Sequence, residues 1–122
     1  MKKKANKILA LIGVRSGSTA VKNKNILSLA KILEQISKNC FIPITAGGGI
    51  KNIDDAKLLF RSGADKIVFN TSIKKNPKLI KKISEVYGEQ SIVASVDVKE
   101  NQSTQLEVYF QNGRINSKIK LE

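Results

Sequence analysis

Three apolar segments of this chain each end in residues that handle phosphate or protons. These residues are Gly48 and Gly49, then Asn70 and Thr71, and finally Asp97. Glycines let backbone amides approach an anion because no Cβ blocks the way, and a following helix end would add partial positive charge. A carboxylate at a strand end can act as a general acid or base. The pattern predicts phosphate binding at the glycines and proton transfer at Asp97.

Each of these residues also has a purely structural explanation. Three consecutive glycines can serve a tight turn that needs positive φ, and Asn and Thr are common turn residues. Asp97 can cap a turn, and Lys99 can either balance its charge or face solvent. Asp65 and Lys66 stand at the opposite, entry end of their strand, where a role in stability or subunit contact is favoured.

The spacing of the apolar segments predicts how these residues are positioned. The segments start near Ile42, Lys66 and Ser91, which leaves room for one helix in each gap. Such spacing is typical of a (β/α)8 TIM-barrel, in which strand ends carry the chemistry and helices cover the outside. A closed barrel needs roughly 250 residues, and this chain has 122. We therefore predict an α/β fold of about half a barrel, with parallel strands, outer helices and two open sheet edges that favour self-association.

Local patterns predict the individual elements. A short strand with a buried pattern is expected over residues 8–13, and Ile92 to Val96 is expected as a strand that Asp97 ends. The expected helices cover residues 26–37, run from an Asn52 cap to Gly63, and run from Asn76-Pro77 to Gly88. Asn112-Gly113 predicts a hairpin turn between residues 106–110 and a returning arm at 114–115.

Composition narrows the classes of function. The formal net charge is +12, but aromatic residues make up only 5% of the chain, so few rings could stack on bases and nucleic-acid binding is disfavoured. The single cysteine, Cys40, and the absence of histidine argue against a disulfide or a metal site and predict a cytoplasmic protein, and we expect no cofactor. The apolar run of residues 8–12 is too short for a signal peptide or a membrane span.

Residues from about 29 to 122 resemble the cyclase subunit of imidazole glycerol phosphate synthase. The resemblance rests on residues 41–50, FIPITAGGGI, on residues 63–72, GADKIVFNTS, and on the shorter runs 75–80, KNPKLI, and 96–99, VDVK. It implies a lyase of histidine biosynthesis that takes ammonia from a glutaminase partner. The enzyme uses that ammonia to split a phosphorylated ribotide into imidazole glycerol phosphate and an aminoimidazole carboxamide ribotide.

The resemblance also implies roles for individual residues. Asp97 matches one of the family's two catalytic aspartates, and Asp65 and Lys66 match the face where the glutaminase docks. The glycines Gly48 and Gly49 match the phosphate-binding turn, and Asn70 and Thr71 match neighbouring substrate contacts. The other catalytic aspartate, and the later strands with a second phosphate site, have no match in this sequence. We therefore expect a truncated, catalytically incomplete cyclase. The alternative is an inactive remnant, or a half-barrel phosphate-binding module from a surface-polysaccharide locus.

The N-terminal segment resembles a different family, the acylneuraminate-type cytidylyltransferases. Residues 15–18, RSGS, and 22–25, KNKN, match the loop that holds the nucleotide triphosphate there, whereas Gly13 and Ser16 depart from the pattern. We therefore divide the chain into a cytidylyltransferase-like stretch, 1–27, and a cyclase-like part, 28–122. A third function, nucleotide-sugar activation, would use four N-terminal residues, Arg15, Ser18, Lys22 and Lys24.

Overall fold

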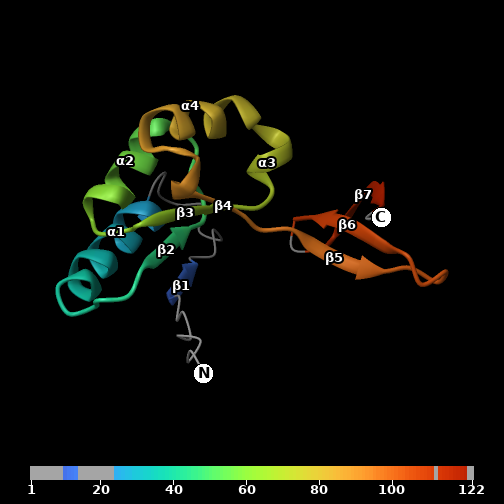
Figure 1. The fold of residues 1–122 in the computed structure, drawn as a ribbon, viewed down its shortest axis with the longest axis horizontal. Coiled ribbons are helices and arrows are strands. Elements are labelled where there is room, and N and C mark those ends of the chain that lie inside the picture. Colours follow the sequence, from blue (N-terminus) through green and yellow to red (C-terminus); the bar gives the residue numbers. More distant parts are fainter. Residues whose placement is uncertain (1–9, 14–23, 112, 121–122) are drawn as a thin grey trace, which may run out of the picture.

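A computed structural model of the chain describes residues 10–13, 24–111 and 113–120. Four parallel strands of these residues form one sheet in sequence order: β1 (Ala10–Gly13), β2 (Ile44–Gly47), β3 (Lys66–Phe69) and β4 (Ile92–Ala94) (Figure 1). Sequential parallel strands joined by helices are the unit from which a (β/α) barrel is built. The sheet does not close, so the prediction of a partial barrel is confirmed.

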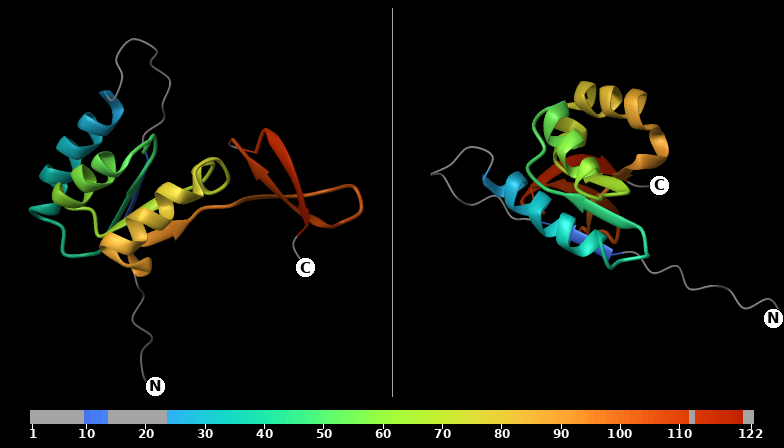
Figure 2. Two further views of the ribbon diagram at one scale, coloured as in Figure 1. Left: turned by 90° about the horizontal axis from the view of Figure 1, so that it is seen from above. Right: turned by 90° about the vertical axis from the view of Figure 1, so that its left-hand side faces the viewer.

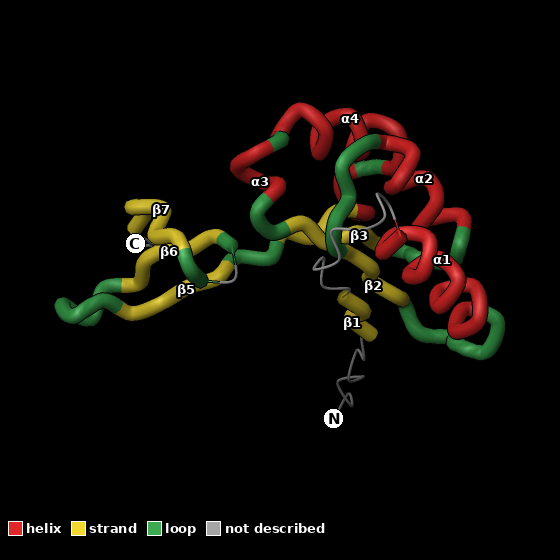
Figure 3. The backbone as a smooth tube through the Cα atoms, turned by 180° about the vertical axis from the view of Figure 1, so that it is seen from behind, coloured by secondary structure: helices red, strands yellow, loops and turns green. Residues whose placement is uncertain are grey.

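The helices cover one face of this sheet. The long ones are α1 (Lys24–Ser37), α2 (Ile53–Arg61) and α4 (Pro77–Tyr87), and short turns α3 (Ser72–Lys75) and η1 (Glu89–Ser91) precede and follow α4 (Figures 1 and 3). The core lies between helices and sheet. Its fully buried large side chains include Leu29, Leu33, Leu59, Ile67 and Ile83. Burial of these apolar side chains is the main term that holds the helices on the sheet.

The helix ends follow the local signals of the sequence. The Asn52 side chain accepts a hydrogen bond from the Asp55 amide (2.9 Å), and that of Asn76 accepts from the Leu79 amide (3.2 Å). Each cap satisfies a backbone donor that the first helical turn leaves without a partner. Gly88, with φ of 85°, ends α4 as predicted. The short helix α3 was not predicted.

A second, antiparallel sheet follows the parallel one. It contains β5 (Asp97–Glu100), β6 (Leu106–Phe110) and β7 (Ile115–Lys120), and Figure 2 shows it extending to one side of the helices. We call this unit the hairpin sheet. The predicted hairpin of β6 and β7 is confirmed, but the strand expected over residues 92–96 ends at Ala94. The prediction that Asp97 ends that strand is therefore wrong: Asp97 opens β5 and pairs with Tyr109 of β6.

The N-terminal predictions fall mostly outside the described residues. The strand expected over residues 8–13 is seen as Ala10–Gly13, but Arg15, Ser18 and Lys22 are not described. Helix α1 runs through the predicted boundary between residues 27 and 28. The division of the chain is thus a prediction about sequence resemblance and does not mark a break in the structure. In the described part of the chain, none of the helices is long and apolar enough to span a membrane.

The turn after α2 generates a stability prediction. Gly63 has φ of 109°, and a Cβ added there would collide with the side chain of Ser37 in α1. We expect Gly63→Ala to lower the free energy of unfolding by roughly 2–4 kcal/mol, because alanine is strained at this positive φ and its Cβ would overpack against Ser37. Urea denaturation measures the change.

Gly88→Ala is the matched control for this substitution. Gly88 also has positive φ, but the atoms that a Cβ would meet belong to the flexible side chain of Gln90. We expect Gly88→Ala to cost only about 1–2 kcal/mol, the backbone cost alone. Equal losses in the two variants would contradict the proposed packing of Gly63 against α1.

Candidate functional site

The carboxyl ends of β2 and β3 bring two of the predicted site segments together. Gly47 pairs with Val68 in parallel register, so Gly48 and Gly49 leave β2 beside the point where Asn70 leaves β3. We call Gly48, Gly49, Asn70 and Thr71 the rim. Neighbouring carboxyl ends of parallel strands are the usual place for active sites in barrels.

The glycine turn has a backbone that only glycine adopts readily. Gly48 has φ of 116° and Gly49 has φ of 69°. An added Cβ at Gly49 would meet no atom within 4 Å, so the turn faces open space there. At Gly47, by contrast, a Cβ would collide with Val68. Close packing therefore explains the first glycine, whereas positive φ characterises the two that follow, and Gly49 is also exposed.

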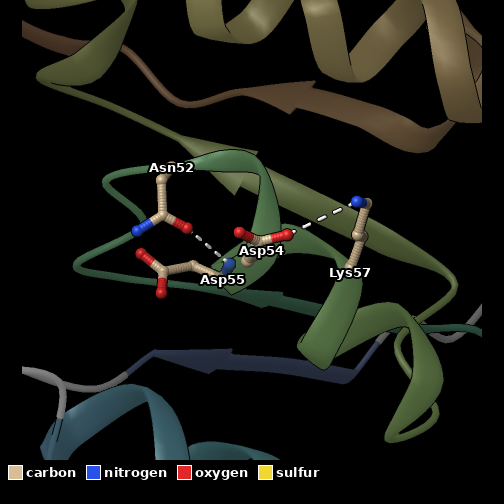
Figure 4. A network of polar contacts seen from close by, with 4 residues as sticks. All are labelled: Asn52, Asp54, Asp55 and Lys57. Atoms are coloured by element: carbon tan, nitrogen blue, oxygen red, sulfur yellow. Dashed lines mark hydrogen bonds and ion pairs between the residues drawn. The ribbon is translucent and has the colours of Figure 1, made fainter.

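The N-terminus of α2 differs from what we expect of an anion site. The Asp55 carboxylate accepts a hydrogen bond from the Lys51 amide (2.8 Å). Asp54 pairs with Lys57 at 3.4 Å (Figure 4). Two carboxylates in the first helical turn already complement the positive end of the helix dipole. The positive end of the α2 dipole is thus already offset by the chain's own acids.

Asn70 and Thr71 are linked to one another and to other parts of the chain. The Asn70 side-chain amide donates to the Ser95 carbonyl oxygen (3.1 Å), and the Thr71 hydroxyl donates to Asn70 Oδ1 (3.1 Å). The Thr71 hydroxyl also accepts from the Gln111 amide of the hairpin sheet (3.3 Å). Both side chains lie at the rim, but each already has a protein partner.

Asp97 is held by the turn that joins β6 and β7. Its carboxylate accepts a hydrogen bond from the Gly113 amide at 3.2 Å. The Lys99 ammonium donates to the Gly113 carbonyl oxygen at 2.6 Å and lies 4.9 Å from the centre of the Tyr109 ring. The two side chains thus hold Gly113 from both its amide and its carbonyl. The sequence predicts the turn at Gly113 but not its contact with Asp97, because no local pattern marks a partner 16 residues away.

Asp65 lies at the opposite end of the strands from the rim, directly before β3. Its backbone amide donates to the Ile44 carbonyl oxygen (2.8 Å), and its carboxylate accepts from the Ile44 amide (2.7 Å). Asp65 therefore joins the entry ends of β2 and β3, and a stabilising role is supported by contacts. Its neighbour Lys66 opens β3 with a half-buried side chain.

The fold and the rim define a partial parallel (β/α) barrel with a glycine turn at its carboxyl end. A family described as "Histidine biosynthesis protein" matches residues 14–122. The chain belongs to this family, and the match begins inside residues 1–27, the segment that resembles the cytidylyltransferases. The resemblance to the cyclase is thereby confirmed at the level of the family.

Curated relatives carry the name "Imidazole glycerol phosphate synthase subunit HisF". The relative from Leptospira biflexa is 46% identical over 70% of this chain and 34% of its own length. The relative from Legionella pneumophila is 45% identical over 71% of this chain and 41% of its own length. That from Methanococcus maripaludis is 49% identical over 60% of this chain and 27% of its own length. The chain thus spans well under half the length of these relatives.

The contacts of Asp65 generate a prediction for stability. We expect Asp65→Ala to lower the free energy of unfolding by about 1–2 kcal/mol, because the Ile44 amide loses a charged hydrogen-bond acceptor. Asp65→Asn should lose less, since its amide oxygen can still accept. The measurement is urea denaturation of each variant.

Glu85→Ala serves as the control, because Glu85 is an exposed acid on α4. An exposed substitution of this kind usually changes stability by no more than about 0.5 kcal/mol. If Asp65→Ala and Glu85→Ala gave the same small loss, Asp65 would have no role in joining the two strands.

Proposed function

We propose that this chain is a cyclase-type half-barrel whose rim binds the phosphate of a ribotide. The observation that carries the proposal is the glycine turn, where Gly48 and Gly49 have positive φ and Gly49 faces open space beside the end of β3. Such a turn can direct backbone amides at an anion. Membership of the histidine biosynthesis family makes a phosphorylated ribotide the substrate class that fits best.

The reaction proposed for the intact enzyme is an ammonia-dependent lyase reaction that forms imidazole glycerol phosphate. Asp97 would move protons in it, and the rim residues Gly48, Gly49, Asn70 and Thr71 would hold the phosphate. A glutaminase subunit would supply ammonia at the edge of Asp65 and Lys66. These roles follow the residues that match the cyclase, and no cofactor or metal is part of the proposal.

A second candidate is a phosphate-binding module without catalysis. The contacts of Asp97 favour it, because its carboxylate binds the Gly113 amide while Lys99 holds the Gly113 carbonyl. A proton-transfer group needs a free path to its substrate. The open edges of the parallel sheet, at β1 and β4, would let either form associate with a second copy.

Two further proposals concern the cellular location of the protein and its substrate. Its location is proposed to be the cytoplasm, on the evidence of the single cysteine. Two substrates are proposed: the ribotide of histidine synthesis, which the family match favours, and a sugar on which an amidine is formed, as the alternative for a surface-polysaccharide locus. Sequencing the surrounding genes tests the second point: histidine genes would favour the ribotide, and sugar-activating genes would favour the amidine route.

Measuring turnover by the purified chain distinguishes the two candidate functions, an enzyme and a phosphate-binding module. With ammonia and the ribotide, we expect a rate below that of an intact cyclase by a factor on the order of 10²–10⁴, the cost of one missing acid or base. Asp97→Asn should remove any residual turnover. Turnover within tenfold of an intact cyclase would show that one aspartate is enough.

Phosphate binding is expected to persist without catalysis. Titration of inorganic phosphate, followed by NMR, should shift the amide signals of Gly48 and Gly49 in the parent chain. We expect Gly48→Val to abolish these shifts, because a β-branched residue at φ of 116° is strained and its side chain blocks the anion.

Asp97→Asn is the control for the titration, since its carboxylate is assigned to proton transfer and lies on β5. It should bind phosphate as the parent does. If Gly48→Val also binds as the parent does, the triple glycine is only a turn and the proposed phosphate site is wrong.

A further inference from the structure

The turn that joins β6 and β7 lies against the start of α3. The Gln111 amide donates to the Thr71 hydroxyl, and the Lys74 ammonium lies 5.1 Å from the centre of the Phe110 ring. The chain also passes directly from β4 to β5 through Ser95 and Val96. The hairpin sheet is thus attached to the rim at its turn as well as through the covalent chain.

The same turn also holds the candidate proton-transfer group. Gly113 donates its amide hydrogen to Asp97, and its carbonyl accepts from Lys99. Gly113 is buried, so this amide and carbonyl are largely withdrawn from solvent. The position of the Asp97 carboxylate relative to the rim therefore depends on where this turn is docked.

We propose that Thr71 is a positioning residue that fastens the hairpin sheet to the rim and so sets the place of Asp97. A hydroxyl has one hydrogen to donate and lone pairs to accept with. Thr71 uses both: it donates to Asn70 and accepts from Gln111. Asn70 in turn donates to Ser95, so hydrogen bonds run without a break from the end of β4 to the hairpin turn.

The backbone of Gln111 supports this role for Thr71. Gln111 has φ of 55°, in the left-handed region that residues other than glycine seldom occupy. Such a conformation persists where surrounding contacts hold it. The hydrogen bond from the Gln111 amide to Thr71 is a contact of this kind, and the neighbouring Phe110, the last residue of β6, contacts Lys74.

This role differs from the one that the resemblance implies for Thr71, which is a substrate contact. It rests on contacts within the chain and not on phosphate binding, so the two can be tested apart. In a hydrogen-bonded chain each bond polarises the next. If an anion accepted the hydrogen of the Thr71 hydroxyl, the lone pairs of the Thr71 oxygen would still be available to the Gln111 amide.

The experiment compares Thr71→Val with Thr71→Ser by amide hydrogen exchange, read by NMR at Gln111 and Gly113. Valine keeps the shape of threonine without the hydroxyl, whereas serine keeps the hydroxyl. A neutral hydrogen bond contributes about 1 kcal/mol, which converts to roughly fivefold in the opening equilibrium. We expect exchange at both amides to rise about fivefold in Thr71→Val and to stay near the parent rate in Thr71→Ser.

Ser72→Ala is the matched control, because it removes the next hydroxyl along the chain, and it should leave both amides unchanged. Unchanged exchange at the buried Ile67 verifies that each variant is folded. Exchange at Gln111 equal to the parent in Thr71→Val would overturn the docking role. Faster exchange at Gln111 with unchanged exchange at Gly113 would overturn the positioning of Asp97.

A phosphate titration of the parent chain keeps this inference separate from the proposed function. If the Gly48 and Gly49 amides do not respond to phosphate but Thr71→Val loosens Gln111 and Gly113, the phosphate site is wrong and the role of Thr71 stands. If phosphate binds and Thr71→Val leaves both amides protected, the proposed binding stands and the inference fails.

Discussion

The parallel register of β2 and β3 is the constraint on which the rest of the structure depends. It brings the carboxyl ends of the two strands to one edge, so that Gly48 and Gly49 lie beside the residues that follow Phe69. The register is held at its entry end by Asp65, which binds Ile44 through both its amide and its carboxylate. It is held along its length by helices that bury Leu59 and Ile67 on one face. In β3 buried and half-buried side chains alternate, so a slip of one residue would turn its buried side chains, Ile67 and Phe69, to the other face.

Three aspartates of this chain share one structural task. Asp55 accepts from the Lys51 amide, Asp65 from the Ile44 amide and Asp97 from the Gly113 amide. Each therefore satisfies a backbone donor at a point where the chain enters or leaves a regular element. A carboxylate in this position makes a stronger hydrogen bond than a neutral acceptor. In a chain with 10 acids and a net charge of +12, these acids serve the backbone while many lysines remain exposed.

Few hydrogen bonds join the rim to the hairpin sheet, and the proposed functional groups are divided between these two parts. Asn70 and Thr71 connect the end of β4 to Gln111, and Gly113 connects that turn to Asp97. The groups proposed for phosphate binding and for proton transfer therefore belong to two sheets. Their relative placement depends on a hydrogen-bonded bridge and not on a continuous core, because the large buried core side chains lie between the helices and the parallel sheet.

The sequence alone determined the features that depend on neighbouring residues. Helical spacing located α1, α2 and α4, the side chains of Asn52 and Asn76 marked two helix starts, and Asn112-Gly113 marked the hairpin. Even the partial barrel followed from spacing, because each gap between the apolar segments leaves room for a covering helix. These signals act over a few residues, where backbone geometry and capping decide the outcome.

Only the tertiary structure decided what the candidate site residues contact. Thr71 meets Gln111 across 40 residues and Asp97 meets Gly113 across 16, and no periodicity or cap predicts either pair. The strand through Asp97 was predicted to continue β4, but pairing with β6 places Asp97 in a second sheet. Such pairings depend on how separate elements dock, and the free energy of docking comes from contacts that form only once the chain is folded.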